Sequence, residues 1–241
     1  MDLYFKLLGM PVFTMKDVEG LYGNIHTARS GVKRLIDKGM VMKIRNNLYT
    51  CKSGETLEPV ANPYRIATEI AKDSFVSHYS ALEYYGYANK KIDEMYVGSG
   101  VNFKNFTFHG KEYVRIKPRI SAGVVMDGNV RITNRERTLL DSIKDMDRVA
   151  GVEEVMRSVV KMKGIREDRL VGYLDLYDNQ FLYQKTGYIL SASHNTLGLS
   201  DAFYAMCAEK AGKSTRYLSN ANKDGRFVAR WSLVVPRNLF A

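Results

Sequence analysis

The stretch from Thr14 to Lys52 constrains the fold of this chain more than any other part of the sequence. Apolar residues recur at helical spacing from Met15 to Tyr22 and again from Ile25 to Lys38. Gly23 and Asn24 separate the two runs, and both residue types tolerate the left-handed backbone angles of a tight turn. The pattern predicts two helices joined by a short turn, the first capped by Thr14.

The second predicted helix buries one face and leaves the other polar. Its expected apolar stripe consists of Ile25, Ala28, Val32, Leu35 and Ile36, with Gly39 as the C-terminal stop. Two strands, Met40 to Ile44 and Leu48 to Cys51, are expected to pair next, because Asn46 and Asn47 suit a tight hairpin turn. With a further helix from Asp2 to Leu8, this outline is that of a winged helix-turn-helix.

The rest of the chain predicts a larger domain of mixed α/β character, so the expected fold class is α+β. Ser53 to Pro59 is polar and is interpreted as a linker, which places the domain boundaries at 1–58 and 59–241. Two hairpins are expected around Gly110 and Gly128. The remaining elements are expected to be helices beginning near Asn134, Val152, Arg166, Phe181 and Ser200, and a terminal strand from Phe227 to Val235.

The net positive charge of the chain indicates which class of partner it binds. The net charge is +10, and the segment from Thr14 to Lys52 alone carries eight cationic residues against three acidic ones, a net +5. Such a surplus favours a polyanion, usually nucleic acid, through phosphate contacts and counterion release. A hydrophobic content of 45% excludes a disordered chain, and no apolar run is long enough to span a bilayer. Met1 to Gly9 lacks the longer apolar centre and cleavage site of a signal peptide, so a cytoplasmic protein without a membrane partner is expected.

The polar face of the second helix is the candidate DNA-reading surface. A duplex major groove admits one α-helix, whose exposed side chains must reach base edges and phosphates. Lys43 and Arg45 alternate along a strand, so they are expected to point the same way towards a phosphate strand or the minor groove. A solvated, non-functional face is the alternative. The candidate DNA-binding residues are His26, Thr27, Arg29, Ser30, Lys33, Arg34, Lys43, Arg45, Asn46 and Asn47.

Catalytic signals are weak, and neither catalytic residues nor a cofactor is predicted. The four histidines are scattered without a second ligand at helical spacing, which argues against a metal site. Ser77 stands beside His78, but adjacent helical residues point apart, so Ser77 is interpreted as a helix cap. Cys51 and Cys207 are expected to be reduced thiols. The scattered histidines are His26, His78, His109 and His194.

Arg137 and Asp141 are spaced i, i+4 beside an apolar face that contains Leu139, Leu140 and Ile143. This spacing permits an ion pair on one helix, worth about 0.3–0.5 kcal/mol when exposed. A structural salt bridge inside the second domain is the favoured interpretation.

With these residues noted, the chain resembles the AbiEi-type antitoxins of abortive-infection (type IV) toxin–antitoxin systems, which are transcriptional autoregulators. The resemblance rests on four stretches in order, of which the second and third are the most specific. They are Phe13-Thr14…Leu35…Gly39…Tyr49, Ser77-x-x-Ser80-Ala81-Leu82-x-x-x-Gly86, Arg137-Thr138-Leu139-Leu140-Asp141 and Trp231-Ser232-Leu233-Val234-Val235-Pro236.

The resemblance implies a repressor that binds inverted repeats in its own promoter as double-stranded DNA, as a monomer or weak dimer. It also implies that the C-terminal domain antagonises a nucleotidyltransferase toxin without needing a stable complex with it. The motif residues carried over for that domain are Ser77, Ser80, Arg137 and Asp141.

Two other functions remain open on the sequence. One is a nucleic-acid-processing enzyme whose winged helix delivers a catalytic C-terminal domain, which lacks the clustered carboxylates expected of such enzymes. The other is a protein-interaction module with an incidental basic surface.

Overall fold

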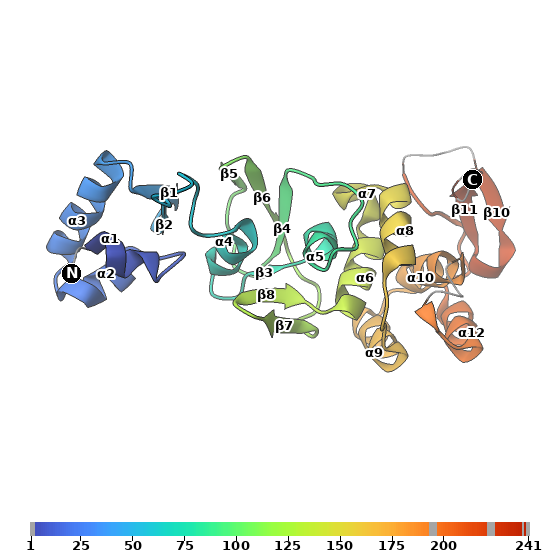
Figure 1. The fold of residues 1–241 in the computed structure, drawn as a ribbon. Helices are drawn as coiled ribbons and strands as arrows, with labels where there is room; N and C mark the ends of the chain where they lie inside the picture. The colour runs from blue at the N-terminus through green and yellow to red at the C-terminus, as the bar shows by residue number, and fades with distance from the viewer. Residues whose placement is uncertain (1–2, 193–196, 221–224, 238, 240–241) are drawn as a thin grey trace.

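The computed structural model describes residues 3–192, 197–220, 225–237 and 239. Its elements form three blocks in a row along the molecule (Figure 1). The first block contains α1 (Leu3–Leu8), α2 (Met15–Tyr22), α3 (Ile25–Asp37), β1 (Val41–Arg45) and β2 (Leu48–Cys51). The middle block contains α4 (Pro63–Glu69), β3 (Phe75–Val76), α5 (His78–Tyr84), β4 (Glu94–Gly98), β5 (Phe106–Phe108), β6 (Lys111–Ile116), β7 (Val124–Asp127) and β8 (Val130–Thr133).

The third block is mainly helical and ends in a small sheet. Its longest helix, α10, has 13 residues, and no described helix combines the length and apolarity needed to cross a membrane. The block contains α6 (Arg135–Lys144), α7 (Met146–Val149), α8 (Val152–Lys161), α9 (Glu167–Tyr177), α10 (Gln180–Ala192), α12 (Asp201–Lys210), β9 (Arg216–Tyr217), β10 (Gly225–Val228), a 3₁₀ turn (Ala229–Trp231) and β11 (Leu233–Pro236).

The middle block is built on a six-stranded mixed sheet with the order β5-β6-β4-β3-β8-β7. Both predicted hairpins are present as its antiparallel edges, β5–β6 and β7–β8. Parallel pairs β4–β6 and β3–β8 join these edges to the antiparallel centre β3–β4. The combination of helices with several sheets agrees with the α+β class predicted from the sequence.

Strand β4 divides the core of the molecule. Met95 and Val97 pack on one side with α4, whereas Tyr96 packs on the other with the helices of the third block. This follows from the alternation of side chains along a strand. The first-block residues Ile44 and Leu48 belong to the same cluster as Met95, so the β1–β2 hairpin packs directly against the middle block.

The segment 53–59, interpreted from its polarity as a linker, forms a closed turn between the first block and the middle block. Lys52 forms an antiparallel bridge with Pro59, and the backbone N–H of Ser53 donates to the carbonyl of Glu58 over 2.8 Å. The N–H of Val60 returns to the carbonyl of Cys51 over 2.9 Å. These backbone hydrogen bonds hold the first block close to the middle block.

The prediction of one terminal strand from Phe227 to Val235 is wrong. The chain forms two antiparallel strands, β10 and β11, connected by the 3₁₀ turn and by Ser232 in the left-handed region at φ 49°. The helices expected near Asn134, Val152, Arg166, Phe181 and Ser200 are all present and begin within about one residue of their predicted starts. Cys51 and Cys207 are free and buried, as expected of reduced thiols.

Candidate nucleic-acid interface

Local capping fixes the start and the end of the two helices that build the candidate interface. Gly23 ends α2 at φ 69°, and its N–H donates to Glu19 over 2.7 Å. The Asn24 side chain then accepts hydrogen bonds from the N–H groups of His26 and Thr27, at 2.8 and 3.2 Å, and starts α3. The Gly-Asn pair thus performs the turn that the sequence predicted.

Helix α3 lies at the outer end of the first block, away from the middle sheet (Figure 1). Ala28, Val32 and Leu35 are buried, but Ile36 is 37% exposed and is not part of the buried stripe predicted for it. All six predicted helix contacts are exposed: His26, Thr27, Arg29, Ser30, Lys33 and Arg34.

The cations of this face are free of carboxylate partners. Arg29, Lys33 and Arg34 form no ion pair within the described part of the chain, and Arg34 donates only to the Ser30 carbonyl at 3.4 Å. Unneutralised guanidinium and ammonium groups on one exposed helix face are available to phosphate oxygens and base edges. A helix that binds in the major groove of DNA requires such free cations on its exposed face.

A surface groove of about 680 Å³ runs between the N-terminal ends of α2 and α3 and the β1–β2 turn. Arg29 lines it from α3, Lys16 from α2, and Asn46 from the turn. The Asn47 side-chain oxygen accepts the N–H of Met15 over 3.1 Å, so the turn is tied to the start of α2. Asn46 and Asn47 both line the groove, and Asn47 is also structurally engaged through its bond to Met15.

The structure corrects the expectation that Lys43 and Arg45 point the same way. The register of β1 against β2 shifts between these two residues, which breaks the alternation of side chains. Lys43 is exposed, but the Arg45 guanidinium lies 5.5 Å from the Phe103 ring centre and 5.3 Å from that of Phe106, in the middle block. Arg45 is thus a contact between blocks, stabilised by cation–π interaction, and not a free wing contact.

The four residues carried over as an antitoxin motif are all buried. Ser80 accepts the N–H of Tyr96 over 2.8 Å, which ties α5 to β4. Arg137 donates to Asp141 over 2.9 Å and to the carbonyl of Ala122 over 2.6 Å, and Tyr177 also donates to Asp141. Burial, followed by the charge of Asp141, raises the pKa of Tyr177 well above its ordinary value. The predicted structural salt bridge is confirmed.

Ser77 does not cap α5 with its side chain, contrary to the prediction. Its Oγ lies 2.8 Å from His78 Nδ1, because Ser77 is extended and His78 adopts φ 53°, so the adjacent side chains meet instead of pointing apart. His78 Nε2 lies 3.1 Å from Asp145. Burial alone would raise the pKa of Asp145, but hydrogen bonds from His78 and Lys144 hold it well below its usual range.

A hydroxyl, an imidazole and a carboxylate in line are the groups that activate a serine nucleophile. Here Ser77 is fully buried, and the cavity beside it measures about 10 Å³, about the space of one water molecule. The arrangement therefore has no room for a substrate group next to Ser77 in this structure. Sequence reasoning missed the link because Asp145 lies 67 residues away.

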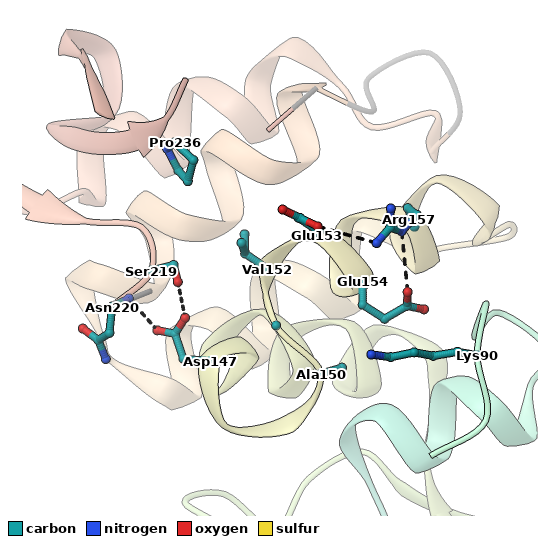
Figure 2. Close-up of a pocket in the computed structure, with 11 residues that line it drawn as sticks. Lys90, Asp147, Ala150, Val152, Glu153, Glu154, Arg157, Ser219, Asn220 and Pro236 are labelled. Carbon is teal, nitrogen blue, oxygen red and sulfur yellow. Dashed lines mark hydrogen bonds and ion pairs between the residues drawn. The ribbon is translucent and has the colours of Figure 1, made fainter. Parts of the chain in front are cut away.

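A second hollow of about 580 Å³ is lined mainly by the third block, with Lys90 of the middle block at one side (Figure 2). Asp147 accepts hydrogen bonds there from Ser219 and from the N–H of Asn220, and Arg157 lies 3.7 Å from Glu153 and 3.5 Å from Glu154. Its carboxylates are thus engaged within the chain. None of the predicted site residues lines this hollow, and no group of three or more potential metal ligands occurs in the described residues.

Comparison with known proteins adds the fold alone. No family model matches the chain, and no curated protein matches its sequence. The structure is similar to that of the RV2827C protein from Mycobacterium tuberculosis, with a TM-score of 0.67 over 97% of this chain and 90% of that chain, at 13% identity. At this identity, the likeness supports a shared mixed α/β architecture.

Proposed function

We propose that this chain is a sequence-specific DNA-binding protein whose first block is a winged helix-turn-helix. One observation carries the proposal: α3 exposes six polar or cationic side chains on one face, without carboxylate partners among the described residues, while its other face is buried. A helix of this kind can enter a major groove while its apolar side stays anchored. Lys43 and Asn46 extend the surface along the hairpin.

We further propose that it acts as an autorepressor and antitoxin in a toxin–antitoxin operon whose toxin is a nucleotidyltransferase. The support for this role is the resemblance of four sequence stretches to AbiEi-type antitoxins. The promoter of the operon, with its inverted repeats, is then the expected operator, and the part of the chain after residue 58 the expected antagonist of the toxin.

Fluorescence anisotropy with the DNA upstream of the gene tests the first proposal, with a shuffled duplex of equal composition as the control. We expect the upstream duplex to bind more tightly than the shuffled one throughout a salt series, because base contacts add to the salt-dependent phosphate term. Equal affinity for both duplexes at every salt concentration would rule out specific repression.

Co-expression tests the second proposal. The chain is expected to restore growth to cells that express the nucleotidyltransferase encoded beside it, and the Arg29→Ala/Arg34→Ala variant is expected to restore growth equally well. Because that variant separates DNA binding from neutralisation, failure of the wild-type chain to restore growth would reject the antitoxin role while leaving the DNA-binding role standing.

A further inference from the structure

A pocket of about 160 Å³ lies where the closed turn after β2 meets the start of α4 and the β5–β6 hairpin of the middle block. It shares no lining residue with the groove at α3. The first block contributes to it through Glu58 and Pro59 of the turn, and the middle block through α4 and the hairpin. Pockets at such junctions between parts of a chain are common sites for small molecules.

The buried part of the lining is apolar and aromatic. Ala61, Ile66, Phe108 and Tyr113 line the pocket, and each is less than 10% exposed. An apolar cavity of about 150 Å³ in another protein accepts benzene. Sites for drug-sized ligands are larger, about 300–1,000 Å³. The pocket therefore has the size of a single ring.

The walls of the pocket are held by local hydrogen bonds and ring contacts. Pro59 is fixed by its antiparallel bridge with Lys52, and Asn62 caps α4 through its side-chain oxygen. On the hairpin side, the Tyr113 ring stacks on the Phe106 ring of the paired strand, with 4.8 Å between ring centres. The pocket is thus formed before any ligand arrives, as is usual for small-molecule sites.

Two hydrogen-bond donors of the lining have no acceptor in the described part of the chain. Tyr113 is fully buried, and its hydroxyl has no hydrogen-bond partner there. Such groups are rare, because burial of a polar atom without a partner costs free energy. Burial also raises the pKa of Tyr113 well above its ordinary value, so the hydroxyl remains a donor. Asn62 uses only its side-chain oxygen for the helix cap, which leaves its amide nitrogen available.

The charges of the lining disfavour an anion. The Glu58 carboxylate and the His109 ring pair with each other, and both side chains are exposed. No lysine or arginine is among the described residues that line the pocket. A carboxylate or phosphate would therefore find no cation there to offset the loss of its water shell.

We propose that this pocket binds a small uncharged molecule that has a single ring and one oxygen able to accept a hydrogen bond. The ring fills the apolar lining, and the oxygen accepts the Tyr113 hydroxyl. A ligand of this class would supply the partner that this buried donor lacks. The proposal does not depend on the function proposed for α3.

Fluorine NMR titration of the full chain with 4-fluorophenol tests the proposal. We expect saturable binding, and we expect 4-fluorotoluene, in which a methyl group replaces the hydroxyl, to bind roughly 2-fold to 10-fold more weakly, the worth of one hydrogen bond. The charged 4-fluorobenzoate should bind more weakly than 4-fluorophenol.

Two variants place the ligand. Tyr113→Phe keeps the ring and is expected to weaken 4-fluorophenol roughly 2-fold to 10-fold and to abolish its advantage over 4-fluorotoluene, with no loss of stability because the hydroxyl makes no bond in the described residues. Ala61→Leu is expected to fill the pocket and remove binding of both probes. Tyr217→Phe, at a site 51% exposed in the third block, is the matched control and should change neither affinity.

Absence of saturable 4-fluorophenol binding would overturn the proposal. So would an advantage of 4-fluorophenol over 4-fluorotoluene that persists in Tyr113→Phe, since the hydrogen bond would then lie elsewhere. If Ala61→Leu does not fold, as judged by circular dichroism, the Tyr113→Phe comparison decides by itself. Tighter binding of 4-fluorobenzoate than of 4-fluorophenol would reject an uncharged ligand.

Discussion

Helices α3 and α6 have the same kind of N-terminal cap, but their arginine side chains lie in different environments. Asn24 caps the first and Asn134 caps the second, each through its side-chain oxygen. Both helices carry arginine beside an apolar stripe. Yet Arg29 of α3 is exposed without an ion-pair partner in the described residues, whereas Arg137 of α6 is 1% exposed and bonded to Asp141.

The comparison shows that a charged residue next to an apolar stripe has no fixed role. On α6, the Arg137 guanidinium donates to the carbonyls of Ile120 and Ala122 and lies over the Tyr177 ring. These contacts from distant parts of the chain bury Arg137, so its role is structural. On α3 nothing in the described residues closes over the polar face, so its charge remains available to a partner. The following predictions separate the two helices by experiment.

The largest expected effect is on stability. Arg137→Ala leaves the Asp141 carboxylate buried without its cation, so the free energy of unfolding is expected to fall by about 3–5 kcal/mol. Arg29→Ala, its counterpart on α3, is expected to change it by less than about 0.5 kcal/mol. Urea denaturation of both variants checks this. Similar losses in the two variants would contradict the contrast drawn between the helices.

The reverse contrast is expected for DNA binding. Arg29→Ala and Arg34→Ala are each expected to weaken binding to the upstream duplex by roughly 1–3 kcal/mol if they contact bases. Lys144→Ala, which removes a cation from α6 instead, serves as the control and should leave the affinity unchanged. Anisotropy titrations measure all three. Unchanged affinity in both arginine variants would show that another face of the first block meets DNA.

The hydrogen bonds of Asp145, at the C-terminal end of α6, predict that the stability of the folded chain depends on pH. The pKa of Asp145 is lowered in the folded chain from an ordinary value of 3.8, so its contribution to stability is present above about pH 4 and is lost as the pH falls. We expect Asp145→Asn to cost about 1.5–2 kcal/mol at neutral pH, the worth of a charge-assisted hydrogen bond. The difference from wild type should narrow below pH 4 in denaturation curves, and a constant difference would refute this role.

The smallest effects are expected in the hairpin. Arg45→Ala removes its contacts with Phe103 and Phe106 and is expected to lower stability by about 0.5–1 kcal/mol, with little change in duplex affinity. Lys43→Ala is expected to leave stability unchanged and to reduce the salt slope of duplex binding by about 1 if Lys43 contacts a phosphate. A larger loss of affinity from Arg45→Ala than from Lys43→Ala would restore Arg45 as a DNA contact.

Local patterns in the sequence were sufficient for most elements. The Gly23-Asn24 turn, the Asn-capped helices and both hairpins of the middle sheet depend on residues within a few positions of one another. The errors fell where tertiary contacts override a local pattern. Ser232 in the left-handed region divides the predicted terminal strand, and the register shift before Arg45 turns that side chain towards Phe103 and Phe106.

In the candidate sites, too, some features follow from local sequence and others depend on tertiary contacts. The exposed face of α3 was predictable because helical periodicity alone separates its apolar side from its polar side. The contact of His78 with Asp145 joins residues 67 positions apart, and that of Arg137 with Tyr177 also joins distant residues, which no local spacing encodes.

The sequence by itself determined most of the helices, turns and strands, and it concentrated half of the net charge in the first block. Only the tertiary structure decided that Arg45 packs on Phe103 and Phe106 and that Arg137 is buried, because burial depends on how distant segments pack. Helical spacing places Arg29 and Arg137 equally well beside an apolar stripe. The difference between a surface cation and a buried one lies in whether other parts of the chain, such as Ala122 and Tyr177, come to meet it.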